Sequence, residues 1–233
     1  METKSLITTE GLKTIGDLLL VVLKRNLKAD AFLSLESKLD AIRTEARSFP
    51  LRMLFAQVPR LTGKQIVFLE AKELAVISSF LPENTFHGWT LERLCRVWVL
   101  LQISQADKIC YLKMINDLFE SAEMNEQVAL YSALPFLIYP EEWIFRCEEG
   151  IRSNIGLILE AIMYYNPYPA HYLSEAAWNQ MILKAFFTDK NVNHIIGLHE
   201  RTNARLTASL KDYIAERLAA HRTVNDEIYK LLV

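Results

Sequence analysis

Apolar residues recur at helical spacing along most of the chain. Leu12, Ile15 and Leu19 begin the first stripe, which predicts a helix over about residues 5–26. A second amphipathic stretch begins at Phe32. The same spacing predicts further helices, near residues 123–134, 141–164, 175–187 and 200–220, followed by a short C-terminal helix.

Proline, threonine and serine mark several expected helix ends. Pro50 and Pro59 bracket a short apolar helix, residues 51–58. Thr62 and Gln65 have capping-box spacing, which predicts that a helix starts there and ends near residue 81. The following helices are expected to start at Thr90 and at Ser104.

The fold class that follows is all-α. No segment alternates apolar and polar residues strictly enough to predict a strand, and only seven glycines are present. Short connections between successive helices favour antiparallel helix pairs, as in HEAT- or armadillo-like α-solenoids or irregular bundles. No repeat of 34 to 47 residues holds in the sequence, and no low-complexity linker divides it. A single domain over residues 1–233 is therefore expected.

Charge and cysteine content narrow the class of protein. The formal charge of −2 gives no electrostatic reason to expect nucleic acid as a partner. Cys95, Cys110 and Cys147 form no C-x-x-C pair, which is typical of thiols in a reducing compartment. No run approaches the ~20 apolar residues of a membrane span, and the N-terminus lacks a signal-peptide pattern. We expect a cytoplasmic protein without a transmembrane segment.

Polar residues interrupt an apolar stripe near residue 155. Residues 151–162 predict a helix that is apolar nearly all round and therefore buried. Arg152, Asn154 and Glu160 fall within it. Buried charge needs a partner, so one interpretation is an ion pair of Glu160 with Arg152 or with a lysine such as Lys184. The other interpretation is the polar floor of a pocket.

An aromatic loop follows that helix. Asn166, Tyr168 and His171 lie in a segment stiffened by two prolines, residues 164–172. Rings with polar tips suit ligand contacts, but they equally suit a loop that plugs a helical core. Asn166 could serve only local backbone donors.

The last third of the chain contributes the remaining candidate residues. Trp178, Asn179 and Lys184 belong to the helix capped by Ser174; Trp178 is typical of a core residue and Lys184 of a solvated one. Arg201 and Asn203 open the last long helix, where they could receive an anion or simply face solvent.

Several chemistries find no support in the sequence. His194 and His199 are five residues apart and do not share a helical face, and no Cys/His cluster exists, so no metal is predicted. Phosphate-binding glycine loops, nucleophile elbows and other catalytic motifs are absent. No cofactor is expected and no catalytic residue can be assigned from a motif.

With these residues in view, the chain resembles the EboA family. The similar segments are Gly150-Ile151-Arg152-Ser153-Asn154, Glu160-Ala161-Ile162, Asn166-Pro167-Tyr168-Pro169-Ala170, Ala176-Ala177-Trp178-Asn179-Gln180-Met181, Lys184-Ala185, Ile196-Gly197-Leu198, Arg201-Thr202-Asn203, Asp212-Tyr213 and Glu216-Arg217. A weaker similarity covers Trp89-Thr90-Leu91 with Arg93 and Arg96. The resemblance spans roughly residues 86–222 and is strongest over 150–220. His199, Ala215 and His221 depart from the family's pattern.

The resemblance implies a setting but no reaction. EboA-like proteins are associated with a bacterial gene cluster for secondary-metabolite traffic, whose other products resemble a UbiA-type prenyltransferase and a TatD-like hydrolase. It implies that the ligand-site candidates include the matching residues Arg152, Asn154, Glu160, Asn166, Tyr168, Trp178, Asn179, Lys184, Arg201 and Asn203, to which the aromatic loop adds His171.

Three functions are compatible with these observations. The favoured one is a non-catalytic protein that binds a small metabolite or lipid-like precursor in a polar pocket between helices. A second is an enzyme with Glu160 as acid or base, assisted by His171 or Lys184. A third is a helical scaffold that docks other proteins of the same gene cluster.

Overall fold

A computed structural model describes residues 6–45 and 48–232, and these residues are helical with no strand. Two isolated backbone bridges occur, Ile66 with Thr90 and Tyr164 with Ile195. The all-α prediction is confirmed. None of the helices in the described ranges has the length and apolar content needed to cross a membrane.

The chain divides into two compact units, Met1–Trp143 and Ile144–Val233, and each is described on its own. The expectation of one domain stays a prediction. The elements of the N-terminal unit are α1 (Thr9–Asn26), α2 (Ala29–Glu45), α3 (Ser48–Thr62), α4 (Ala71–Ser78), η1 (Glu83–Phe86), α5 (Leu91–Leu100), α6 (Lys108–Ser121), α7 (Met124–Ser132), η2 (Leu134–Phe136) and η3 (Pro140–Trp143).

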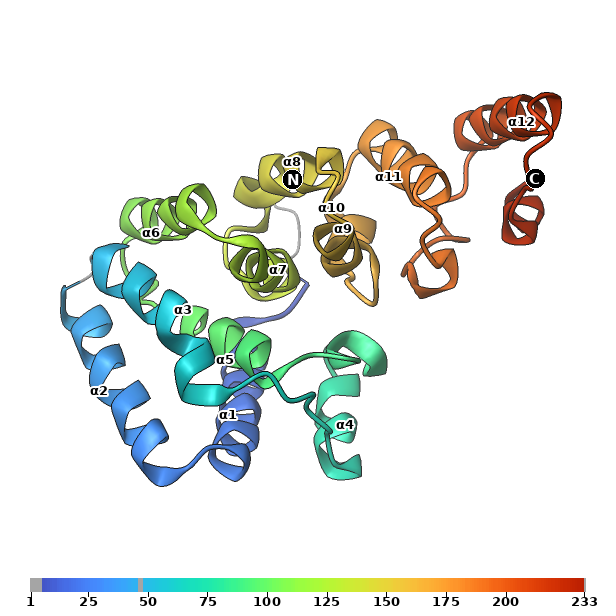
Figure 1. Ribbon diagram of the computed structural model, residues 1–233. Helices are drawn as coiled ribbons and strands as arrows, with labels where there is room; N and C mark the ends of the chain where they lie inside the picture. Colours follow the sequence, from blue (N-terminus) through green and yellow to red (C-terminus); the bar gives the residue numbers. More distant parts are fainter. Residues whose placement is uncertain (1–5, 46–47, 233) are drawn as a thin grey trace. The chain divides into compact units, whose positions relative to one another are not determined.

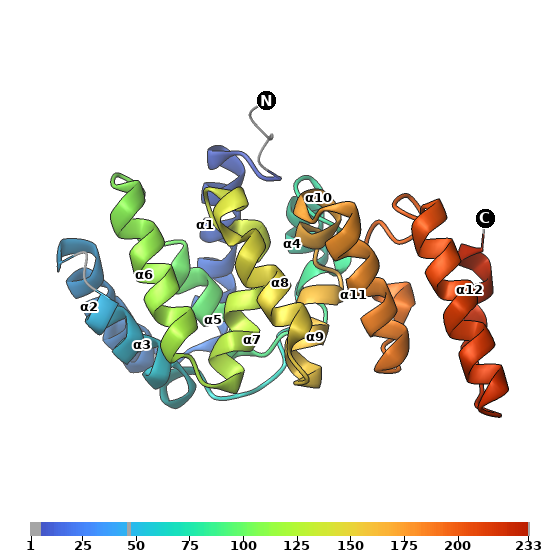
Figure 2. The same ribbon diagram turned by 90° about the horizontal axis from the view of Figure 1, so that it is seen from above.

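Helix α5 is the centre of the N-terminal unit. It packs against α1, α3 and α7, and α3 in turn packs against α2 and α6 (Figures 1 and 2). Its apolar residues Leu91, Leu94 and Val97 are completely buried. A central helix normally carries few charges, yet Glu92 and Arg96 of α5 are also buried. These two charges mark the part of the unit considered below.

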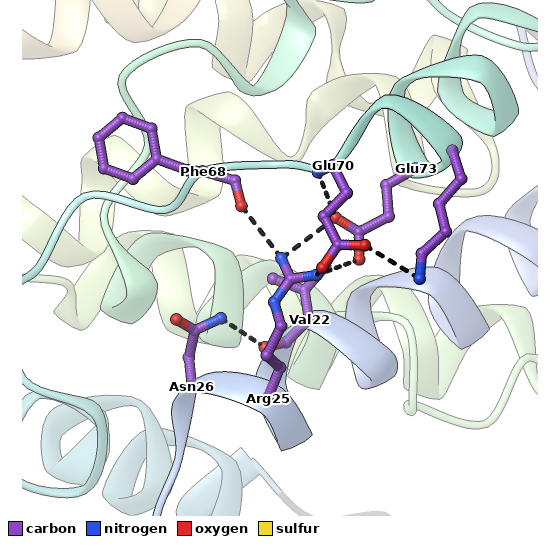
Figure 3. A network of polar contacts seen from close by, with 7 residues as sticks. Val22, Arg25, Asn26, Phe68, Glu70 and Glu73 are labelled. Atoms are coloured by element: carbon purple, nitrogen blue, oxygen red, sulfur yellow. Dashed lines mark hydrogen bonds and ion pairs between the residues drawn. The ribbon is translucent and has the colours of Figure 1, made fainter.

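An ion-pair network joins α1 to α4 (Figure 3). Arg25 donates from Nη1 to Glu70 at 2.6 Å and to Glu73 at 2.7 Å, and from Nη2 to the Phe68 carbonyl at 3.0 Å. Glu73 also accepts the backbone N–H of Glu70 at 2.7 Å, which closes the first turn of α4. Glu73 is buried but fully bonded, so the network is structural rather than a site.

The C-terminal unit contains a second series of short helices, namely α8 (Ile144–Arg152), α9 (Gly156–Met163), α10 (Tyr168–Tyr172), α11 (Glu175–Phe187), η4 (Val192–His194), α12 (Ala204–Ala219) and η5 (Asp226–Leu231). Helix α11 packs against α8, α12 and η4, and α9 packs against α8 and α10. The fully buried Trp178, Met181 and Ile182 give α11 its inward face.

The predicted continuous helix over 141–164 is wrong. It breaks between α8 and α9, where the Ser153 N–H donates to the Gly150 carbonyl and the Ser153 hydroxyl accepts the Ile155 N–H. These bonds turn the chain, so Ile155 and Leu157 are 40% and 48% exposed. The expectation of a helix buried nearly all round is therefore also wrong.

Several helix ends differ from the predicted positions. Thr62 ends α3 instead of opening a helix, because its hydroxyl donates to the Val58 carbonyl and Gly63 follows with φ of +71°. Pro59 lies inside α3 instead of ending it. Asp107 rather than Ser104 caps α6, by accepting the Cys110 N–H.

Other boundaries agree with the prediction or nearly so. Thr90 and Ser174 cap α5 and α11 as expected, accepting the N–H of the residue three positions on. The aromatic loop contains a short helix, α10, and the last long helix starts at Ala204. The short C-terminal helix is present as the 3-10 helix η5.

Candidate functional site

All eleven residues predicted from the sequence to bind a ligand lie in the C-terminal unit. Arg201 is held by three hydrogen bonds and a ring contact. Its guanidinium donates to three backbone carbonyls at the end of α10, those of Pro169 and Ala170 at 3.0 Å and of Leu173 at 2.8 Å. It also lies over the Trp178 ring, with Cζ 4.7 Å from the ring centroid. Arg201 thus supplies donors to the carbonyls of Ala170 and Leu173 and a second donor to that of Pro169, which already accepts the Leu173 N–H.

Asn179 and Asn203 form a reciprocal amide pair between α11 and the start of α12. Asn179 donates to the Asn203 side-chain oxygen at 3.1 Å, and Asn203 donates to that of Asn179 at 2.9 Å. Asn203 also caps α12 by accepting the Leu206 N–H at 3.0 Å, and it donates to the Arg201 carbonyl at 3.1 Å. The pair therefore fixes the angle at which the chain enters α12.

The aromatic loop is held by Asn166, which is 5% exposed. Its amide donates to the Ala161 carbonyl and its oxygen accepts the Tyr168 N–H, both at 3.0 Å. Tyr168 is completely buried and packs against Tyr172 with ring centroids 4.8 Å apart. Asn166 serves local backbone groups, one of the alternatives that the sequence left open.

The charged candidates near α9 form pairs that differ from those expected. Glu160 accepts from Lys190 at 2.6 Å, rather than pairing with Arg152 or Lys184. Lys184 donates instead to the Asn154 side chain at 2.9 Å. Arg152 is exposed at the end of α8 and forms no hydrogen bond or ion pair with the described residues. The structural ion pair at Glu160 is therefore present, with a different partner.

Trp178 and His171 differ in burial. Trp178 is completely buried, so its interpretation as a core residue is confirmed, and its indole nitrogen lacks a hydrogen-bond partner among the residues described. His171 is exposed on α10. Partial burial and the positive charge of Arg201 lower the pKa of His171 below its usual value.

Most of the predicted ligand groups are thus bonded to one another or to nearby backbone. Within residues 144–232, no hydrogen bond or ion pair joins Glu160 to His171 or Lys184, the three groups of the enzymatic hypothesis. A ligand role for this set stays a prediction, because binding would have to replace contacts that already hold the unit together.

A hollow with a different character lies in the N-terminal unit. It has a volume of about 790 Å³, is partly open, and lies among α3, α5, α6 and the start of α7. Its lining comprises Phe49, Arg52, Met53, Ala56, Pro59, Arg60, Lys64, Glu92, Arg96, Leu118, Ser121, Glu123, Met124, Asn125 and Glu126. Small-molecule sites typically occupy about 300–1,000 Å³ and combine apolar walls with a few polar groups. We call this hollow the α3–α5 cavity.

The buried floor of the α3–α5 cavity includes Arg96, which is 3% exposed. Pro59 has no N–H, so the carbonyl of Phe55, four residues earlier in α3, loses its helical partner. Arg96 fills that gap by donating its Nε–H to the Phe55 carbonyl at 3.1 Å. Its outer nitrogens are less well bonded, with Nη1 3.5 Å from the Asn125 carbonyl and Nη2 3.8 Å from the Glu126 carboxylate. Burial lowers the pKa of Arg96, and the charge of Glu92 opposes that change.

Glu92 supplies the second buried charge of the α3–α5 cavity and is 6% exposed. Its Oε2 atom is buried and has no hydrogen-bond partner in the part of the chain that the structure describes. A buried carboxylate oxygen without a donor is costly, and such atoms are rare in folded proteins. A molecule bound in the cavity could supply the missing donor.

Sequence reasoning found only a trace of this cavity. Arg93 and Arg96 belong to the weaker part of the family resemblance. Arg93 donates to the Ser132 hydroxyl at 2.7 Å and lies over the Trp89 ring at 4.6 Å, whereas Arg96 lines the cavity. The signal that could have been used was Glu92 and Arg96, four residues apart in a mostly apolar helix whose only other charge is Arg93.

Comparison with known proteins places the chain in a family. The family profile described as metabolite traffic protein EboA matches residues 15–233. The chain belongs to the EboA family. The match includes both the α3–α5 cavity and the predicted residues of the C-terminal unit, so family membership alone does not choose between them. No curated protein and no solved structure gave a match.

Proposed function

We propose that this EboA-family protein is a non-catalytic component of metabolite traffic that binds a small metabolite in the α3–α5 cavity. The single observation that carries the proposal is the buried Glu92 oxygen without a donor in a cavity of ligand size. The description of the family as a metabolite traffic protein agrees with such a role. No catalytic motif in the sequence calls for a reaction.

The composition of the cavity wall supports binding rather than structural packing alone. Phe49, Met53 and Met124 line it and are 64%, 44% and 44% exposed. Exposed apolar side chains next to buried charges provide both the surface and the orienting groups that a small molecule requires. The C-terminal residues predicted from the sequence are the alternative site.

The experiment is a thermal-shift screen of fractionated metabolite extracts. Ala56 lines the cavity and is exposed, so Ala56→Trp should fill the entrance without burying the new ring in the core. Ala75→Trp on α4 is the matched control, because Ala75 is also exposed but does not line the cavity. We expect an active fraction to raise the melting temperature of the unmodified protein and of Ala75→Trp, but not of Ala56→Trp. An equal shift for Ala56→Trp would exclude the cavity.

The wider setting is also part of the proposal. We place the protein in the cytoplasm of a bacterium, in a pathway of secondary metabolism, with proteins of the same gene cluster as partners. Docking of those proteins to a helical scaffold is compatible with a metabolite site, since a protein can bind a metabolite in a cavity and partners on its outer surface. Pull-down with cluster proteins in the presence and absence of an active fraction would test whether partner binding depends on the ligand.

A further inference from the structure

The chemistry of the α3–α5 cavity restricts what it can bind, provided that the proposed function holds. The unsatisfied Oε2 of Glu92 is a hydrogen-bond acceptor and requires a donor. In the described residues, no ion pair within 4.0 Å joins Glu92 to Arg96 or to another cation. A hydroxyl or ammonium group of a bound molecule would supply the missing donor.

Arg96, in contrast, requires a hydrogen-bond acceptor. Its Nε is committed to Phe55, but its outer nitrogens lie 3.5 and 3.8 Å from their nearest acceptors, beyond the usual 2.7–3.2 Å of such bonds. A guanidinium whose outer N–H groups lack close acceptors is the typical protein group for binding a carboxylate or phosphate. Arg52, Arg60 and Lys64 also line the cavity, and together with Arg96 they outnumber its three carboxylates, Glu92, Glu123 and Glu126, by one charge.

The two groups are close enough to act on one small molecule. Glu92 and Arg96 are four residues apart in α5, so their side chains start on the same helical face, roughly 5–6 Å apart at Cβ. A purely anionic ligand would leave Glu92 without a donor. A purely cationic ligand would be repelled by the positive charge of Arg96. Phe49, Met53 and Met124 then supply an apolar wall for the rest of the molecule.

We propose that the α3–α5 cavity binds a small amphipathic anion, a carboxylate or phosphate, that also bears a hydroxyl or ammonium donor. Arg96 binds the anionic group, Glu92 accepts the donor, and the apolar body lies against Phe49, Met53 and Met124. The small excess of positive charge in the lining favours an anion over a cation. The ligand class thus follows from a matched pair of buried charges and an apolar rim.

Methionine methyl NMR provides a direct readout. The Met53 and Met124 methyl groups report occupancy of the cavity, Met114 reports folding of the same unit, and the buried Met163 and Met181 report the C-terminal unit. The carboxylate probe is phenyllactate, compared with hydrocinnamate, which lacks the hydroxyl, and phenyllactamide, which lacks the charge. The phosphate probe is 1-hexylglycerol 3-phosphate, compared with hexyl phosphate, which lacks the hydroxyl.

We expect phenyllactate or hexylglycerol phosphate to shift the Met53 and Met124 signals and to bind more tightly than the analogues that lack either group. The arm that binds identifies the anion. Glu92→Gln should weaken binding about tenfold or more, as for loss of a hydrogen bond to a charged group. Arg96→Lys should do the same. If Arg96→Lys also shifts the Met114 signal, the substitution has disturbed the fold of the unit. The isosteric Glu92→Gln then provides the test. Lys28→Gln, an exposed cation outside the cavity, should leave binding unchanged.

Failure of the ligand class can be separated from failure of the proposed function. Metabolite extract that shifts Met53 and Met124 while none of the anionic probes does would overturn the proposed ligand class and leave the cavity as the site. Preferential binding of phenyllactamide would overturn it in the same way. Extract that shifts neither methyl would overturn both proposals.

Discussion

Arg96 donates its Nε–H to the Phe55 carbonyl across 3.1 Å and thereby joins α5 to α3 at the floor of the α3–α5 cavity. The carbonyl is available because α3 continues through Pro59, which cannot donate to it. A buried arginine usually has an acidic partner at hydrogen-bond distance. The nearest carboxylate of an Arg96 ion pair, that of Glu126, is 3.8 Å away, and the Phe55 carbonyl instead holds the inner nitrogen in place. This arrangement leaves the outer nitrogens for the cavity.

A double-mutant cycle tests this relationship. Arg96→Met should lower the free energy of unfolding by about 2 kcal/mol, because it removes a buried hydrogen bond and the positive charge near Glu92 and Glu126. In a Pro59→Ala background the Phe55 carbonyl regains a helical partner, so the same substitution should cost about 1 kcal/mol less. Urea denaturation measures the four proteins. Arg52→Met, an exposed residue of the cavity lining, should cost the same in both backgrounds, and a coupling of zero for Arg96 would contradict the account.

The Asn179–Asn203 pair gives a second prediction. Asn179→Ala removes two side-chain hydrogen bonds between α11 and α12 and should destabilise the protein by about 1–2 kcal/mol. Gln180→Ala, at the exposed neighbouring position, should change stability by less than about 0.5 kcal/mol. Hydrogen exchange should speed up at the start of α12 in the first variant only. Unchanged stability together with lost metabolite binding would instead make Asn179 a ligand residue.

A side chain at Gly197 is expected to destabilise the protein. It has φ of +77°, and a Cβ there would lie 2.9 Å from the Cβ of Ala170. Gly88 has a similar φ of +71° with no atom within 4 Å of a Cβ, so Gly88→Ala measures backbone strain alone, about 1 kcal/mol. Gly197→Ala should cost clearly more, by about 1–3 kcal/mol of overpacking. Equal losses of stability for Gly88→Ala and Gly197→Ala, measured by thermal or urea denaturation, would show that Ala170 moves away without a cost in free energy.

His171 makes stability depend on pH. Its pKa lies below 6.5 in the folded protein, because of partial burial and then the charge of Arg201. Below about pH 6.5 the unfolded chain therefore binds more protons than the folded one, and this contribution to stability falls as the pH decreases. The stability of the unmodified protein relative to His171→Gln should thus be greater at pH 7.5 than at pH 5. His199→Gln, at an exposed site, is the control. A difference that grows towards pH 5 would reverse the assigned sign.

Local signals in the sequence predict much of the helical framework. Thr90 and Ser174 are identifiable as caps because capping depends on residues three positions apart. Thr62 misleads the same reasoning, since its hydroxyl bonds backwards to Val58 in the last turn of α3. The break after Arg152 carries no proline, and the apolar spacing continues across it. The turn at Ser153 depends on local hydrogen bonds that apolar periodicity does not report.

The candidate site is harder to predict than the fold. The polar residues of the C-terminal unit stand out in the sequence, but the partners of Arg201 and Glu160 lie about thirty residues away along the chain and cannot be assigned from spacing. The α3–α5 cavity draws its lining from four helices between Phe49 and Glu126. In the sequence only the spacing of Glu92 and Arg96 within a mostly apolar helix indicates it, and the missing hydrogen bond of Glu92 becomes visible only in three dimensions.

Native mass spectrometry of the protein incubated with metabolite extract tests the central claim most directly, because it detects a bound small molecule whatever its identity. The variants to compare are Ala56→Trp, which blocks the entrance of the α3–α5 cavity, and Asn179→Ala, which removes the amide pair of the C-terminal unit. The account predicts an adduct that is lost in Ala56→Trp and retained in Asn179→Ala. An adduct retained in Ala56→Trp and lost in Asn179→Ala would contradict it and move the binding site to the C-terminal unit.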